Sequence, residues 1–113
     1  MNIEMVELPG GVVLRPADEL DLLGYLSLVE QIDDLLRDGK RHVVVDLELV
    51  TYVNSSVARV LLALHERAQN AGGSVTLAEV RGGARVALDA AGALDVLPNF
   101  ETVQEAVASV GAA

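Results

Sequence analysis

Residues 43–57 read VVVDLELVTYVNSSV, and this stretch decides the fold of the chain. Its first three residues are β-branched and apolar, which is typical of a central strand buried on both faces. Asn54, Ser55 and Ser56 are residue types preferred at a helix N-cap. Apolar residues then recur at helical spacing as far as the glycine pair at 72–73, namely Val57, Val60, Leu61, Leu64 and Ala68. The stretch therefore predicts a strand, a loop and a long helix.

The residues before this stretch predict a β-hairpin and a helix. Residues 3–8 and 12–14 have the character of two strands around a Pro-Gly-Gly turn, and the second strand should stop before Pro16. After Asp21, a helical pattern that ends at Gly39 places apolar side chains on one face, namely Leu22, Tyr25, Leu26, Val29, Ile32 and Leu36.

The residues after it predict one more strand and two helices. The strand covers 75–77, and a short helix over 83–91 is closed by Gly92. Thr102 and Glu105 form a capping box for a last helix to about Val110. Strand–helix–strand units imply parallel pairing. We therefore expect an α/β fold, a single domain over residues 1–113 with a mixed, mostly parallel sheet and about four helices.

Composition excludes several classes of function. The 113 residues include no Cys, which removes disulfides, thiolate metal sites and a cysteine nucleophile. The formal net charge of −9 argues against binding to nucleic acid or to an anionic membrane. No apolar run approaches the roughly 20 residues that span a bilayer, and acids stand where a signal peptide has bases. We expect a cytoplasmic protein without direct membrane insertion.

Residues able to carry out catalysis are few. His42 and His65 show no metal-ligand spacing and are interpreted as boundary polar residues. No Gly-x-Ser-x-Gly elbow presents a serine nucleophile. One acidic group is interpreted as a solvated helix face, with a carboxylate metal site as the alternative: Asp33, Asp34 and Asp38. We therefore expect no enzyme, no catalytic residue, no cofactor and no metal.

The segment Asn54-Ser55-Ser56 has both a structural and a functional interpretation. Backbone N–H groups are unpaired at a helix start and the helix dipole is positive there, so one of these side chains should cap the helix. A serine at this place could also be phosphorylated, because a helix N-terminus tolerates a phosphate. The two interpretations are compatible if different residues carry them.

From residue 43 to residue 73 the chain resembles STAS domains, the anti-sigma factor antagonist family. In that family an apolar strand ending in Asp-Leu leads through a loop to Asp-Ser-Ser-Gly and a long helix that ends in Gly-Gly. The matching segments here are 43–47, 52–57, 61–65 and 71–73. Glu19-Leu20-Asp21 looks like the family's Gly-Glu-Leu-Asp with Asp18 in place of the glycine. Residues 85–92 and 97–100 look like its C-terminal segment.

The resemblance implies a regulatory binding module. In the family, the second serine of the motif is phosphorylated by a partner that is both an anti-sigma factor and a kinase, and phosphorylation ends the binding. The match places this role on Ser56, with Ser55 as the alternative. The implied partners are the anti-sigma factor kinase and a phosphatase that reverses the modification.

Two departures from the family motif favour a second hypothesis. Asn54 replaces the usual Asp, and Val57 replaces the usual Gly where a kinase would approach the backbone. A STAS subunit that regulates a membrane transport assembly by docking would need no serine phosphorylation. A third hypothesis, an enzyme or small-ligand binder, has no support beyond the family's occasional nucleotide binding.

The expected docking surface is the loop and the start of the long helix. Its candidate partner-binding residues are Asp21, Asn54, Ser55, Ser56, Val57, Ala58, Arg59 and Leu62. Ala58, Leu62 and His65 form a second stripe on the helix, which is either the edge of a wide buried face or a contact patch. Asp21 either shapes the same surface, as the resemblance implies, or is a plain helix cap.

Overall fold

Five strands form one sheet in the computed structural model, which describes residues 3–17 and 22–111 apart from the side chains of 22–24 and 111. The strands lie in chain order across the sheet: β1 (Ile3–Leu8), β2 (Gly11–Pro16), β3 (His42–Asp46), β4 (Ser74–Ala78) and β5 (Asn99–Phe100). β1 and β2 are antiparallel, and every later pair is parallel. The predicted mixed, mostly parallel sheet is confirmed.

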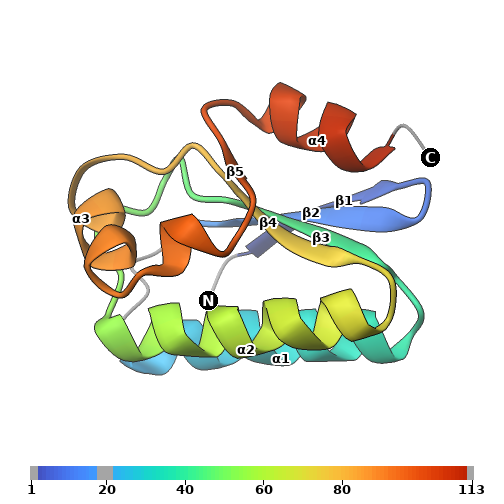
Figure 1. The fold of residues 1–113 in the computed structure, drawn as a ribbon, viewed down its shortest axis with the longest axis horizontal. Helices are drawn as coiled ribbons and strands as arrows, with labels where there is room; N and C mark the ends of the chain where they lie inside the picture. The colour runs from blue at the N-terminus through green and yellow to red at the C-terminus, as the bar shows by residue number, and fades with distance from the viewer. Residues whose placement is uncertain (1–2, 18–21, 112–113) are drawn as a thin grey trace.

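Helices cover both faces of the sheet, as Figure 1 shows. Helices α1 (Leu22–Arg37) and α2 (Ser55–Asn70) lie side by side on one face, and α4 (Val103–Gly111) lies on the other. Helix α3 (Gly82–Ala90) and the 3₁₀ turn η1 (Ala93–Asp95) lie at one end of the sheet. The four α-helices of the described residues agree with the expected fold class.

The core is aliphatic and is centred on β3. Val43, Val44 and Val45 are fully buried, as the β-branched run predicts for a central strand. Val43 and Val45 join the large core beneath α1 and α2, whereas Val44 faces the smaller core beneath α4. Alternation along one strand thus supplies both sides of the sheet.

Two expectations about the elements were wrong, and one element was missed. Leu26 was expected on the apolar face of its helix but is 45% exposed, while Leu28, which the sequence interpretation omitted, is fully buried. Two residues along a helix correspond to a rotation of about 200°, so when Leu28 faces the sheet Leu26 faces solvent. Strand β2 also runs to Pro16 instead of stopping before it. Strand β5, with only two residues, was not expected at all.

The turn from α2 into β4 requires close backbone contact. A Cβ added to Gly73 would lie 1.6 Å from the carbonyl oxygen of Arg41, which accepts a hydrogen bond from the Ser74 amide at 2.9 Å. No side chain fits in that space. Glycine at position 73 therefore allows the chain after α2 to approach the backbone at Arg41 closely enough for β4 to begin.

Candidate functional site

The loop between β3 and α2 is anchored at the carboxyl end of the sheet. The Leu47 amide donates to the Ala78 carbonyl at 2.9 Å, and the Val50 and Val53 side chains are buried in the large core. Between these anchors the loop presents two large apolar side chains to solvent. They are Leu49, 45% exposed, and Tyr52, 49% exposed.

Asn54 caps helix α2. Its backbone is extended, and its Oδ1 accepts a hydrogen bond from the Ser56 amide at 2.8 Å. Its carbonyl oxygen accepts from the Val57 amide at 2.9 Å. The cap predicted for this segment is confirmed, and Asn54 rather than a serine provides it.

The hydroxyl groups of Ser55 and Ser56 are consequently not used for capping. Both residues are exposed, and neither hydroxyl has a hydrogen bond within the described part of the chain. The first turn of α2 contains no acidic residue. Arg59 lies three residues after Ser56 on the same side of the helix, is exposed, and makes no ion pair with any described residue.

Several candidate docking residues lie elsewhere than expected. Val57 and Ala58 are fully buried in the large core, so their side chains cannot contact a partner. The β-branched Val57, which replaces the family's glycine where a kinase would approach the backbone, therefore points its side chain into the core. Leu62 is half-buried. Asp21 lies outside the described residues.

His65 is a core residue, not the boundary residue that the sequence suggested. Only 2% of it is exposed, and its Nδ1 accepts a hydrogen bond from the Val75 amide at 3.0 Å. The ring therefore carries its proton on Nε2 when neutral. Burial lowers the pKa of His65 below its usual value. With Ala58 also buried, most of the second stripe on α2 belongs to the buried face.

The acidic groups serve structural contacts. Asp33 forms ion pairs with Arg37 on its own helix and with Arg67 on α2, and the hydrogen bond from Arg67 lowers the pKa of Asp33. At the end of β3, Asp46 accepts a hydrogen bond from the Glu48 amide, and burial raises its pKa. Within residues 3–17 and 22–111, no cluster of three metal-ligating side chains occurs.

A family model described as the STAS domain matches residues 2–106. The chain belongs to the STAS family. This STAS domain has no match among curated protein sequences. Its described residues include no helix with both the length and the apolar character needed to cross a bilayer.

Solved structures of similar fold are described as anti-sigma factor antagonists. One from Mycobacterium paratuberculosis is 22% identical, with a TM-score of 0.84 over 96% of this chain and 92% of that chain. Unphosphorylated SpoIIAA is 17% identical, with a TM-score of 0.81 over 96% and 95% of the two chains. Phosphorylated SpoIIAA of Bacillus is 16% identical, with a TM-score of 0.72 over 96% and 98%.

Sequence reasoning missed the two apolar side chains of the loop in this STAS domain. Leu49 and Tyr52 stand among residues that it interpreted only as a connection between strand and helix. Each directly precedes a buried valine, Val50 or Val53, and this pairing is the signal that could have placed them on the surface.

Proposed function

We propose that this STAS domain is an anti-sigma factor antagonist that binds an anti-sigma factor kinase and loses this binding when Ser56 is phosphorylated. One observation carries the proposal. Asn54 takes over the capping of α2, which leaves the hydroxyls of Ser55 and Ser56 exposed and without a partner among the described residues. A kinase can therefore reach an acceptor hydroxyl without first breaking the helix cap.

The electrostatics of the helix start support phosphate on Ser56. The helix dipole is positive there, and the first turn holds no carboxylate that would repel the new charge. The unpaired Arg59 follows at a distance of three residues, close enough along the helix for its guanidinium to reach a phosphate on Ser56. A phosphate adds about −1.5 to −2 charges to the site.

The proposed docking surface combines the loop with the exposed face of α2. It consists of Leu49, Tyr52, Ser55, Ser56, Arg59 and Leu62. Apolar side chains on the same surface as a serine would explain how the switch acts. Unmodified, the surface can be dehydrated by a partner, whereas a phosphate in its middle would have to be buried at a large desolvation cost. Val57 and Ala58 support this surface from beneath without contacting the partner.

Phosphorylation is tested directly with ATP and the cognate serine kinase anti-sigma factor, which this proposal predicts to be encoded by a neighbouring gene. Mass spectrometry should find one phosphate on Ser56, and Ser56→Ala should abolish it while Ser55→Ala leaves it in place. An unmodified Ser56 with a kinase that phosphorylates another substrate would show the proposal to be wrong.

Binding is tested with the same partner by calorimetry. Ser56→Ala should bind like the unmodified protein, and Ser56→Asp should bind at least about tenfold more weakly, a loss of about 1.4 kcal/mol. Both variants keep the Asn54 cap, so a loss of binding does not reflect a loss of fold. Under the alternative, docking to a membrane transport assembly, Ser56→Asp would bind its transporter partner unchanged and the anti-sigma kinase not at all.

A further inference from the structure

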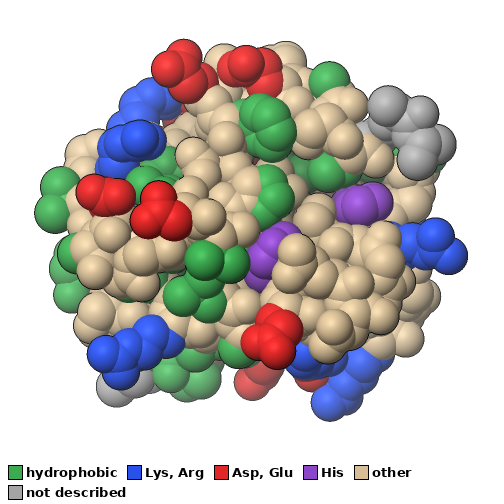
Figure 2. Space-filling view, viewed as in Figure 1, with side chains coloured by type: hydrophobic (Ala, Val, Ile, Leu, Met, Phe, Trp, Pro, Cys, Tyr) green, Lys and Arg blue, Asp and Glu red, His purple; other side chains and the backbone are tan. Residues whose placement is uncertain are grey.

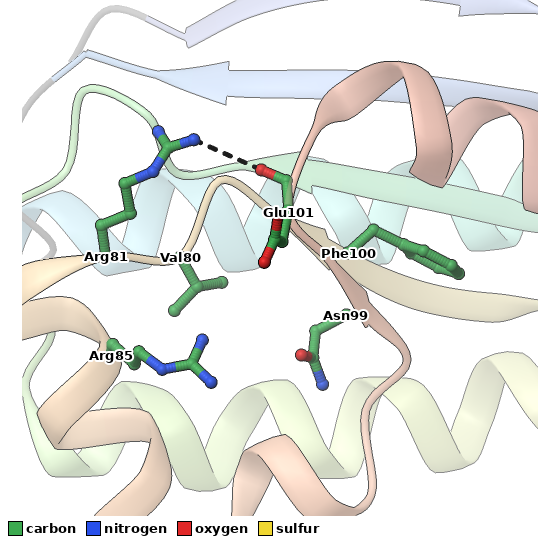
Figure 3. A pocket seen from close by; sticks show the side chains of 6 residues that line it. All are labelled: Val80, Arg81, Arg85, Asn99, Phe100 and Glu101. Atoms are coloured by element: carbon green, nitrogen blue, oxygen red, sulfur yellow. Dashed lines mark hydrogen bonds between the residues drawn. The ribbon is translucent and has the colours of Figure 1, made fainter.

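A second site lies at the carboxyl ends of β4 and β5, beside α3. It is a cavity of about 500 Å³ lined by Val80, Arg81, Arg85, Asn99, Phe100 and Glu101 (Figure 3). Open α/β sheets commonly place their ligands in crevices outside the carboxyl ends of parallel strands. None of the residues of the proposed docking surface lines this cavity.

The charge of Arg81 is already used by the protein. Its guanidinium pairs with the Glu79 carboxylate at 2.6 Å and donates to the carbonyl oxygen of Glu101 at 3.4 Å. These contacts hold Arg81 as part of the cavity wall. The charge that the cavity offers to a ligand therefore comes from the other two charged side chains, Arg85 and Glu101.

Arg85 and Glu101 are exposed side chains of opposite charge that have no partner in the part of the chain that the structure describes. Neither side chain makes an ion pair or a hydrogen bond with any described residue, and they do not pair with each other. Figure 3 shows the Arg85 guanidinium and the Glu101 carboxylate entering the same space from different sides. The cavity therefore has a positive and a negative side.

The amide of Asn99 adds a fixed acceptor. Its Nδ2 donates to the carbonyl oxygens of Leu94 and Leu97, both at 3.0 Å, which locks the orientation of the amide group. Its Oδ1 consequently faces the cavity (Figure 3). Val80, nearly buried, supplies an apolar surface between the polar groups.

We propose that this cavity binds a free α-amino acid as a zwitterion. The carboxylate of the ligand pairs with Arg85, and its ammonium group lies between the Glu101 carboxylate and Oδ1 of Asn99. A ligand with both charges satisfies both free groups of the protein. A simple anion would leave Glu101 unpaired and repelled, and a simple cation would do the same to Arg85. The ligand and the site differ from those of the proposed antagonist function, which does not depend on them.

The proposal is tested on the whole, isotopically labelled protein by titration with each of the common L-amino acids, observed through backbone amide shifts. At least one amino acid should bind at millimolar concentration or below, with shifts concentrated in residues 80–85 and 99–101. Arg85→Gln and Glu101→Gln should each weaken binding at least about tenfold, the effect of losing a charge-assisted hydrogen bond. Arg41→Gln and Glu66→Gln, exposed residues outside the cavity, are the matched controls and should bind like the parent chain.

Modified ligands separate a zwitterion site from a simple ion site. The N-acetyl derivative lacks the ammonium group and the amino acid amide lacks the carboxylate, so neither should bind. The N-acetyl derivative could instead bind as tightly as the free amino acid, and Glu101→Gln could bind the amino acid as tightly as the parent chain. These two results together would show that the cavity is a simple anion site and that the proposal is wrong. Absence of shifts with every amino acid, or shifts confined to another part of the chain, would overturn it.

Discussion

At the scale of single residues, the segment Asn54-Ser55-Ser56 divides two tasks. The sequence could predict that one of these side chains caps the helix, because all three are good caps. It could not predict which one, since that depends on the extended backbone that Asn54 adopts and on the 2.8 Å approach of its Oδ1 to the Ser56 amide. Because Asn54 is the cap, both serine hydroxyls are without a partner among the described residues.

His65 makes stability depend on pH in the range where imidazole titrates. Its pKa is lowered in the folded state by burial, so on acidification the unfolded chain takes up this proton first. The stability is therefore complete above the unfolded pKa of about 6.5 and decreases as the pH falls below it, by at most about 1.4 kcal/mol per pH unit. Urea denaturation between pH 7.5 and pH 5.5 should show this loss.

The variant His65→Asn isolates the cause, because an amide oxygen can still accept from the Val75 amide but does not titrate there. It should be less stable than the parent chain at neutral pH, owing to the lost volume, and should show no loss between these two pH values. His42→Asn is the control and should keep the loss. An equal loss in His65→Asn would assign the pH dependence to another group.

At the scale of elements, one carboxylate links the start of α4 to the end of β4, in addition to the apolar packing of α4 on the sheet. Glu79 follows β4, is 8% exposed and adopts a left-handed backbone conformation with φ of 59°. Its Oε2 accepts a hydrogen bond from the Val103 amide at 3.0 Å, in the first turn of α4, and its Oε1 pairs with Arg81. The capping box adds a bond from the Glu105 amide to the Thr102 hydroxyl at 3.1 Å.

Removing the Glu79 side chain should loosen α4 selectively. Glu79→Ala leaves the Val103 amide without its acceptor, and we expect a loss of about 1–3 kcal/mol in the free energy of unfolding. Amide hydrogen exchange should become faster in α4 while α2 stays protected. Glu79→Gln is the matched control, since its amide oxygen can still accept from Val103. Unchanged exchange in α4 of Glu79→Ala would contradict this attachment.

Elements with a repeating pattern could be predicted, and those that depend on neighbours could not. The β-branched run of β3 and the apolar spacing of α2 each identify their own element. Strand β5 has two residues, too few for any alternation, and is a strand only because Leu77 and Ala78 pair with it. Similarly, the choice between Leu26 and Leu28 on α1 depends on which way the helix faces the sheet.

At the scale of the whole molecule, the net charge of −9 lowers stability through self-repulsion. Figure 2 shows acidic and basic side chains interspersed over one face, so charge of one sign is not gathered into a single patch there. Screening by salt should therefore stabilise the fold. We expect the thermal midpoint at pH 7.5 to rise between low and moderate NaCl concentration, as followed by circular dichroism.

The size of this salt effect should follow the net charge. At pH 5, closer to the isoelectric point of about 4.4, the same addition of NaCl should raise the midpoint less. A midpoint that falls with salt at pH 7.5 would contradict this prediction. It would mean that ion pairs such as Asp33 with Arg67 and Arg15 with Asp46 stabilise the fold by more than the self-repulsion destabilises it.

The candidate site as a whole was only partly accessible to sequence reasoning. The serines could be placed at the start of a helix from the local pattern. The buried positions of Val57 and Ala58, and the exposure of Leu49 and Tyr52, depend on how α2 and the loop lie on the sheet. The cavity beside α3 joins residues about 20 positions apart, a proximity that only the pairing of β4 with β5 creates.

The strands lie across the sheet in the same order as along the chain, and this order affects how the protein can fold during its synthesis. Each new strand joins the free edge left by the strand before it, so no strand must wait for a later one before it can pair. The hairpin of β1 and β2 can form on the ribosome as soon as it emerges, and β3 and β4 can add to it in order of synthesis. The two residues of β5 then end the sheet at its growing edge, and a strand this short offers few backbone groups for pairing with other nascent chains.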